Sequence, residues 1–456
     1  MDTYQQCIIP SCGRTHDVSE VLTGCICGNL LDVKYRSRPD KGLKEVFYER
    51  RSSRGNIFDE SGVWGFRELI NFVPGIDIED YDSYSRVLVT YDGDEGKTKP
   101  FHLTKVAQYI GIKPENFWLQ FEGNNPTGSF KDNGMATAFT HAKMLGVKRV
   151  ACASTGNTGA SMAAYAANEL FMEGVVFVGE GKIAVGKLAQ ILAYGAKILE
   201  IKGDFDDAMA RIKEAANKRN IYLVNSLNPF RLEGQKTIMY RVLDYFDWEV
   251  PDWIVFPGGN LGNTAAFGKA FTELKEWGWI KKVPRIAVVN AAGADTLYTL
   301  YNDWKLKWNM GNVDDEAIEE YYSYLDEKDV KAKTKATAIQ ILKPVNLKKA
   351  LRTLELLDGV VEEVSDHEIL DAMAVVGKNG FGCEPASSAS VAGIKKLVEK
   401  GIVEEDETTV GILTGHILKD PSSIIEYHSN LTNRFANPPR KVENDLRKIL
   451  AAIETD

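Results

Sequence analysis

Lys131 lies where a short apolar run gives way to a polar turn, a position typical of a lysine that takes part in chemistry. The run Phe117 to Phe121 predicts a β-strand, and the turn Asn125 to Gly128 follows it. A lysine between a strand and a helix is held rigidly and partly desolvated, which favours the neutral amine that attacks a carbonyl to form a Schiff base. Because most lysines only solvate a surface, this interpretation needs support from elsewhere in the chain.

A second polar turn follows the apolar run at residues 148–152. It carries hydroxyl and amide side chains at Ser154, Thr155, Asn157 and Thr158. One or two such groups are enough to cap the next helix, so the excess indicates a ligand. At a helix N-terminus these donors suit a carboxylate, and we expect Ser154, Thr155 and Thr158 to hold that of a substrate.

A third loop, Pro257 to Asn263, is rich in glycine and lies between an apolar run at 252–256 and a predicted helix over 264–277. Glycine lets backbone N–H groups turn toward an anion, and the helix dipole adds to the attraction. The loop lacks both the G-x-G-x-x-G spacing and the Lys-Ser/Thr pair of nucleotide-binding loops. A Schiff-base lysine, an anion-binding turn and such a phosphate loop together predict pyridoxal 5′-phosphate as the cofactor.

Seven motifs, in order from about residue 90 to residue 425, resemble the threonine synthases, a family of fold-type II pyridoxal-phosphate enzymes. They are the lysine motif, the turn at 154–159 and the segments 186–190, 225–235, 335–339, 383–387 and 414–420. The lysine and glycine motifs are common to all fold-type II enzymes, whereas the segment 225–235 is more specific to this family. The resemblance implies an α/β fold of the tryptophan synthase β kind, with two parallel or mixed-sheet domains.

The resemblance also assigns roles to individual residues. Lys131 forms the Schiff base and moves protons. Asn157 bonds the phenolic oxygen of the cofactor, Thr414 faces its pyridine nitrogen, and the loop of Gly259, Asn260, Leu261, Gly262 and Asn263 holds its phosphate. The substrate phosphate is expected at Asn225, Ser226 and Arg231, with Asn260 in reach, because the arginine fork suits phosphate oxygens.

The implied reaction converts O-phospho-L-homoserine and water into L-threonine and phosphate, by γ-elimination and β-addition of water. Two other enzyme classes stay open: cysteate synthase, which uses O-phosphoserine and sulfite, and threonine or serine dehydratase. A dehydratase has no need of a phosphate pocket at Arg231, whereas cysteate synthase shares that need. A third interpretation, an idle scaffold that binds partners, is disfavoured by the intact Lys131, Asn157 and Thr414.

Composition narrows the expected partners and compartment. The chain has 456 residues, 44% of them hydrophobic, and a formal net charge of −9. This charge argues against nucleic acid, and no apolar run reaches the ~18 residues that span a bilayer. The N-terminus lacks the pattern of a signal peptide. We therefore expect a cytoplasmic enzyme that binds a small phosphorylated amino acid and neither nucleic acid nor membrane, and we expect a homodimer.

Four cysteines, Cys7, Cys12, Cys25 and Cys27, cluster near the N-terminus, and a glycine follows the second and the fourth. Cysteine pairs followed by glycine are typical of zinc knuckles. The spacings C-x4-C and C-x-C depart from the usual C-x2-C, so two interpretations stay open: a structural zinc site, or a ribbon of reduced thiols without metal. Disulfides are disfavoured in a cytoplasmic chain.

Alternation of strands and helices predicts the domain organisation. Strand-like runs at 148–152, 174–179, 196–201, 221–224, 252–256, 285–290 and 408–413 are separated by amphipathic stretches of helical length. This alternation is typical of parallel sheets covered by helices. We predict a cysteine-containing element over 1–40, the large domain over 41–134 and 216–456, and an inserted small domain over 135–215. The charged stretch 302–335 predicts an exposed helical insertion.

Overall fold

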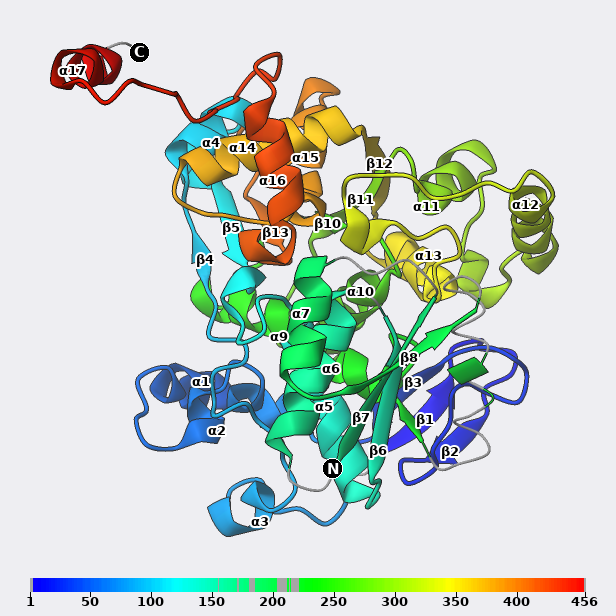
Figure 1. The fold of residues 1–456 in the computed structure, drawn as a ribbon. Coiled ribbons are helices and arrows are strands. Elements are labelled where there is room, and N and C mark those ends of the chain that lie inside the picture. Colours follow the sequence, from blue (N-terminus) through cyan, green and yellow to red (C-terminus); the bar gives the residue numbers. More distant parts are fainter. Residues whose placement is uncertain are drawn as a thin grey trace.

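The computed structural model describes residues 3–154, 156–169, 172–179, 185–202, 211–212, 214 and 221–454, which contain three β-sheets flanked by helices (Figure 1). The smallest sheet is antiparallel and has the strand order β2-β1-β3. Its strands are β1 (Thr3–Cys7), β2 (Thr15–Asp17) and β3 (Leu31–Tyr35). The cysteine-containing element predicted near the N-terminus thus folds around a sheet of its own.

The largest sheet has six strands in the order β12-β11-β10-β13-β5-β4. They are parallel except β4, which runs antiparallel to β5 at one edge. The strands are β4 (Pro100–Phe101), β5 (Phe117–Phe121), β10 (Trp253–Pro257), β11 (Arg285–Ala291), β12 (Val360–Val364) and β13 (Thr409–Leu413). The strand predicted before the lysine motif is confirmed as β5.

A third sheet has four parallel strands in the order β8-β7-β6-β9. They are β6 (Arg149–Ala153), β7 (Glu173–Gly179), β8 (Lys197–Ile201) and β9 (Tyr222–Leu223). Every strand-like run predicted from the sequence is a strand within a residue or two of its expected ends. β9 lies beyond residue 215, the predicted end of the small domain, and the domain boundaries themselves stay predictions.

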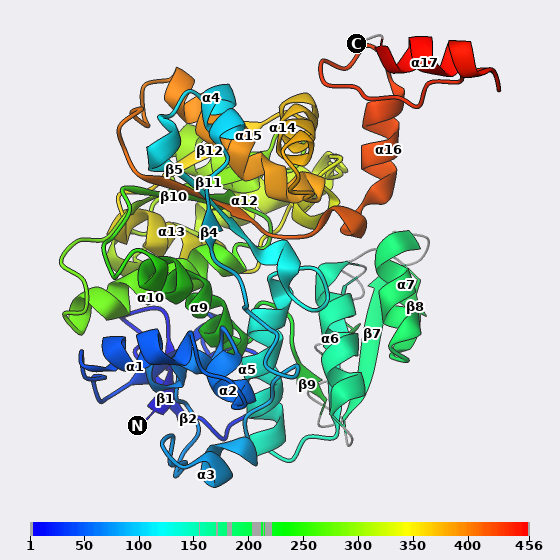
Figure 2. The same cartoon turned by 90° about the vertical axis from the view of Figure 1, so that its left-hand side faces the viewer.

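The helices lie on both faces of the six-stranded sheet and beside the four-stranded sheet (Figures 1 and 2). Before β10 they are α1 (Leu43–Arg50), α2 (Ile57–Glu60), α3 (Tyr81–Ser85), α4 (Thr104–Ile110), α5 (Lys131–Met144), α6 (Asn157–Asn168), α7 (Val185–Ala193) and α9 (Pro229–Tyr245). After it come α10 (Gly262–Glu276), α11 (Thr296–Tyr298), α12 (Asp315–Glu327), α13 (Leu347–Leu356), α14 (Asp366–Lys378), α15 (Pro385–Glu399), α16 (Pro421–Ser429) and α17 (Leu446–Glu454).

Both faces of the large sheet are buried, which explains why its strands read as continuous apolar runs. In β10, Ile254 and Phe256 belong to the core that contains α9, α10 and α13. Val255 points to the other face, into a core shared with α4, α14 and α15. This alternation follows from the two-residue period of a strand.

The charged insertion contains the helix α12, as its composition predicts, but the helix is not exposed all round. Ile318, Tyr321 and Leu325 recur at helical spacing and are buried, while the other face is solvated. At the far end of the chain, α17 stands away from the body together with the C-terminus (Figures 1 and 2). Among the helices in the described ranges, none is both long and apolar enough to cross a membrane.

His141 ties three parts of the fold together. Its Nε2 donates to the carbonyl of Val18, 2.6 Å away, and its Nδ1 lies 2.5 Å from the hydroxyl of Tyr222, so the ring bridges α5, the turn after β2 and β9. Burial favours the neutral imidazole and lowers the pKa of His141 from 6.5 to about 4.

We expect the protein to lose stability as the pH falls through the window from 6.5 to about 4. In that window the unfolded state binds a proton that the folded state excludes, which costs the folded state up to about 3 kcal/mol. Urea unfolding of the intact chain across these pH values measures the loss. His141→Gln, which does not titrate, should show a smaller loss over the same window; an equal loss would assign it to other groups.

Candidate active site

The predicted site residues meet where the carboxyl ends of parallel strands from the two larger sheets face one another. A cavity there is lined by these candidates: Lys131, Asn157, Ser226, Arg231, Gly259, Asn260, Leu261, Gly262, Asn263 and Thr414. They follow β5, β6, β9, β10 and β13, so five strand ends contribute to one cavity. Ligands of open α/β sheets bind at this edge because the loops after the strands converge there.

Lys131 is the first residue of α5, and a buried carboxylate holds its turn in shape. Asp132 accepts hydrogen bonds from the N–H and the hydroxyl of Thr127, both at 2.7 Å, and from Ser161 at 2.5 Å. Burial raises the pKa of Asp132, and these hydrogen bonds oppose the shift. The half-buried Lys131 has its side-chain nitrogen 3.6 Å from the centre of the Phe130 ring. The turn therefore presents one amine at a defined position beside the cavity.

The lysine turn is also bonded to the segment that directly follows strand β13. The N–H of Phe130 donates to the carbonyl of Thr414 at 3.0 Å, and Ser129 pairs with Gly415 as an isolated antiparallel bridge. The hydroxyl of Thr414 lies 3.0 Å from that of Ser387. Lys131 and the hydroxyl expected to face the pyridine nitrogen are thus neighbours in space, although 283 positions (414 minus 131) separate them in the chain.

The glycine loop forms a cradle at the N-terminus of α10. Leu261, the N-cap of this helix, has the left-handed φ of 60° and makes no capping hydrogen bond through its side chain. A Cβ at Gly259 would lie 3.0 Å from the backbone of Ile339, a close approach that favours glycine there. First-turn N–H groups without a side-chain acceptor, at the positive end of a helix, suit a phosphate.

Arg231 is a buried cation beside this cradle, with 2% of its surface exposed. One terminal nitrogen donates to the carbonyl of Val224 at 2.8 Å and the other to Thr158 at 3.3 Å, while Nε has no partner. Burial lowers its pKa to about 10, which leaves the guanidinium charged at neutral pH. In the described part of the chain no carboxylate pairs with it, and an unneutralised buried charge favours an anionic ligand.

Three of the predicted substrate residues are not among those that line this cavity, and of these Thr158 contacts Arg231. Asn225 uses its amide to bridge two strand ends: its oxygen accepts from the N–H of Ala153 at 3.0 Å and its nitrogen donates to the Ala153 carbonyl at 2.9 Å. Thr158 accepts from Arg231, and Ser154 accepts from the N–H of Gly156 at 3.1 Å. Thr155 lies outside the described residues.

Glu384 and Gln235 are site residues that the sequence reasoning did not single out. Glu384, 1% exposed, accepts from Nδ2 of Asn157 at 2.6 Å. Gln235 donates to Asn263 at 2.7 Å, and its own oxygen is buried without a partner. Both lie inside family motifs, at 383–387 and 225–235, and that location was the signal that could have identified them.

These groups fit pyridoxal phosphate. The cavity combines one amine for the aldehyde, an uncapped helix N-terminus for the phosphate and a pair of hydroxyls for the ring nitrogen. The side-chain oxygen of Asn157 is buried without a partner, as expected of a group that awaits a ligand. A wider cavity of about 670 Å³, beside α1, contains none of the candidate residues. The chemistry therefore belongs to the narrower cavity at Lys131.

Comparisons with known proteins agree with this geometry. A family model described as pyridoxal-phosphate dependent enzyme matches residues 91–415. The threonine synthase of Methanocaldococcus jannaschii is 39% identical over 455 residues, which cover 98% of this chain and 100% of that protein. The chain belongs to the threonine synthases, within the pyridoxal-phosphate-dependent enzymes. The threonine synthase of Methanosarcina acetivorans is also 39% identical, and the match covers 93% of this chain and 94% of that protein.

A solved structure shows that the fold is shared as well. Threonine synthase from Escherichia coli matches with a TM-score of 0.64 at 16% identity, covering 93% of this chain and 90% of that one. The family and the fold class expected from the motifs are therefore confirmed. As a member of this family the chain is a pyridoxal-phosphate-dependent lyase.

Proposed function

We propose that the protein converts O-phospho-L-homoserine and water into L-threonine and phosphate. The observation that supports this substrate is the presence of two separate positions for anions. The N-terminus of α10 suits the phosphate of the cofactor, and the buried charge of Arg231 suits a second phosphate carried by the substrate. A substrate without a phosphate would leave the guanidinium buried and unneutralised.

In this proposal the residues of the chain bind, orient and move protons. Bound pyridoxal phosphate supplies an electron sink that stabilises negative charge at the substrate α-carbon. The amine of Lys131 holds the cofactor aldehyde in the resting enzyme and then carries protons at Cα and Cβ of the substrate. Arg231 holds the substrate phosphate and keeps it in place after the Cγ–O bond has broken.

The surrounding side chains position these two groups. Asp132 shapes the turn that presents Lys131. Asn225 ties the end of β9 to that of β6, and at this strand end the carbonyl of Val224 accepts from Arg231. Glu384 fixes Asn157, the proposed partner of the cofactor phenolic oxygen. The substrate carboxylate is proposed to bind at Ser154, Thr155 and Thr158.

The reaction route predicts where solvent hydrogen enters the product. Turnover of O-phosphohomoserine in deuterated water should yield threonine that carries deuterium at both Cα and Cγ, because the γ-carbon becomes a methyl group by protonation. Proton NMR of the purified threonine measures both positions. Threonine labelled at Cα alone would contradict γ-elimination and would indicate a β-replacement enzyme.

Phosphate release with different substrates separates the alternatives. O-phosphohomoserine alone should release phosphate and form threonine in equal amounts. Phosphate release from O-phosphoserine only in the presence of sulfite would favour cysteate synthase, and formation of a keto acid from threonine or serine would favour a dehydratase. A protein inactive with all of these substrates would be a scaffold.

Three further properties belong to the proposal. We propose a structural zinc ion at Cys7, Cys12, Cys25 and Cys27. The cytoplasm is the proposed compartment. None of the six cysteines forms a disulfide, which agrees with a reducing environment. A homodimer that binds neither nucleic acid nor membrane remains a prediction from the sequence.

A further inference from the structure

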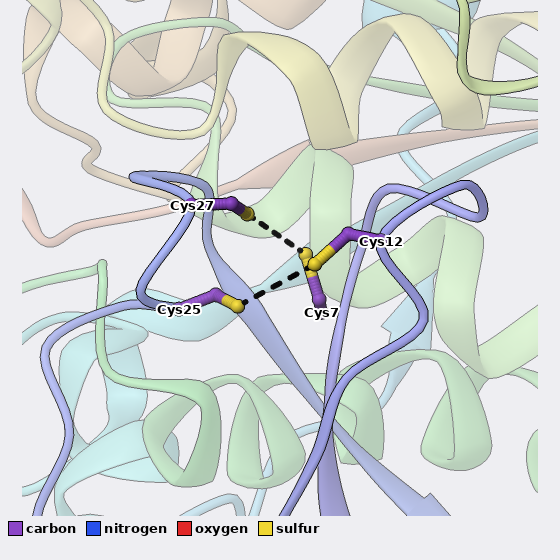
Figure 3. A group of neighbouring side chains, drawn as sticks. All are labelled: Cys7, Cys12, Cys25 and Cys27. Carbon is purple, nitrogen blue, oxygen red and sulfur yellow. Dashed lines mark hydrogen bonds between the residues drawn. The ribbon is translucent and has the colours of Figure 1, made fainter.

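The four N-terminal cysteines come together at one end of the three-stranded sheet. Cys7 is the last residue of β1, Cys12 lies in the turn after it, and Cys25 and Cys27 lie in the turn before β3. Figure 3 shows the four side chains pointing toward one another from the end of β1 and from these two turns. Their sulfur atoms all lie within 4.8 Å of one another.

The sulfur separations fit a shared metal ion and not disulfides. Sγ of Cys7 is 3.5 Å from that of Cys27, and Sγ of Cys12 is 3.8 Å from that of Cys25. A disulfide would bring the sulfurs to about 2.05 Å. Four sulfurs bound to a zinc ion at about 2.3 Å would stand about 3.8 Å apart at the corners of a tetrahedron.

Both turns have the backbone that a metal knuckle needs. Gly13 and Gly28, each directly after a cysteine, have left-handed φ values of 55° and 84°. These conformations favour glycine, and they fold each turn back on itself: the N–H of Gly13 donates to Ile9, and that of Gly28 to Cys25. The side chain of Asn29 donates to the sulfur of Cys27 at 3.5 Å.

The same turn is bonded to helix α13. The oxygen of Asn29 accepts from Lys348 at 2.7 Å. The next strand adds a buried ion pair, in which Asp32 lies 2.9 Å from Lys349 and 2.7 Å from Arg352. Burial alone would raise the pKa of Asp32, but the two cations hold it well below its usual range. The cysteine turn and the start of α13 therefore form one fastened unit.

The residue that precedes α13 touches the phosphate loops of the active site. The amide nitrogen of Asn346, a fully buried residue, donates to the carbonyls of Ser226 at 3.1 Å and Asn260 at 3.2 Å. The side-chain oxygen of Asn260 accepts from the N–H of Val345 at 3.2 Å. Contacts thus run without a break from the cysteine turn through Lys348 and Asn346 to the loops after β9 and β10.

We infer that the four cysteines hold a tetrahedral zinc ion that keeps these phosphate loops in position through Asn29, Lys348 and Asn346. The centre is structural: it lies outside the catalytic cavity and offers the substrate no open coordination position. Its effect on substrate binding rests on the proposed function, whereas the presence of the metal does not.

Metal analysis tests the centre itself. Protein purified without chelator should contain about one zinc ion per chain. Replacement of zinc by cobalt should give the visible bands of tetrahedral thiolate coordination, a readout independent of activity. Cys12→Ser should lose the metal, whereas Cys152→Ala, which removes a cysteine outside the cluster, should keep it. A metal-free wild-type protein, or one that holds iron instead, would overturn the zinc assignment.

Lys348→Met tests the connection to the active site, because it removes the bond to Asn29, together with the ion pair between Lys348 and Asp315, and leaves the cysteines intact. We expect it to keep its zinc and to raise KM for O-phosphohomoserine roughly 3- to 10-fold with little change in kcat, since a mutation along such a series of contacts alters the coupling only modestly. Lys348→Arg should restore KM. Lys343→Met, which removes the exposed pair with Asp326, is the matched control and should leave KM near wild type.

The outcomes separate the parts of the inference. An unchanged KM in both Lys348→Met and zinc-depleted protein would overturn the connection while the zinc centre stands. If Lys348→Met has a higher KM but has also lost its zinc, Lys348 supports the metal site instead. Lack of any turnover of O-phosphohomoserine by wild-type protein would contradict the proposed function and not the metal centre.

Discussion

Lys131→Ala is expected to lower kcat by roughly 10³-fold or more, because one amine both holds the cofactor aldehyde and carries the protons of the reaction. The variant should still bind pyridoxal phosphate through the cradle at α10, but without a covalent link. Wild-type protein should absorb visible light and, after reduction with borohydride, carry the cofactor on the peptide that contains Lys131. The variant should lose both the band and the label.

Lys419→Met is the control for this experiment, since Lys419 is another buried lysine that donates to the same turn, at the carbonyl of Thr127. It should keep the covalent label on Lys131. A label that persists in Lys131→Ala, or that maps to Lys419 in the wild-type protein, would contradict the assignment of Lys131.

Arg231→Met is expected to lower kcat/KM for O-phosphohomoserine roughly 10- to 150-fold, because a charge-assisted contact of this kind contributes about 1.5–3 kcal/mol. The loss should appear with the phosphorylated substrate and also as weaker inhibition by inorganic phosphate. Steady-state kinetics with the cofactor in excess measures both effects.

Two readouts test whether Arg231 acts on the substrate phosphate. Arg231→Lys should lie between the methionine variant and the wild type, since lysine keeps the charge but loses the two-pronged contact. Cofactor content should stay near wild type in both variants, because the cofactor phosphate is assigned to the N-terminus of α10. Loss of pyridoxal phosphate with unaltered use of O-phosphohomoserine would reverse the two phosphate assignments.

Local signals in the sequence were sufficient to locate most strands of the two larger sheets and the chemical motifs. The runs that became β6, β7, β10, β11 and β13 are buried on both faces, so their apolar character is continuous and easy to detect. The helix predicted over 264–277 is α10, at 262–276. The edge strand β12 escaped notice because it carries two glutamates, one of which, Glu362, is buried beside Lys400.

The hydrogen-bond partners of the polar side chains could not be predicted from local signals in the sequence. Asn225 was expected at the substrate phosphate, and the structure shows its amide bonded to the backbone of Ala153. Glu384 stands 227 positions after Asn157, yet its carboxylate accepts from that amide. No periodicity in a sequence encodes such a pair, because the contact depends on how two sheets are placed relative to each other.

The cysteines show the same division between sequence and tertiary structure. Residue types and the glycines after Cys12 and Cys27 predict two knuckle-like turns, since the left-handed backbone is a local property of glycine. Their approach to within 4.8 Å required the antiparallel pairing of β1 with β3, which brings Cys7 opposite Leu31. The sequence by itself determined the chemical groups and the local turns that present them. Only the tertiary structure decided which groups meet, because long-range packing brings together residues that no local interaction connects.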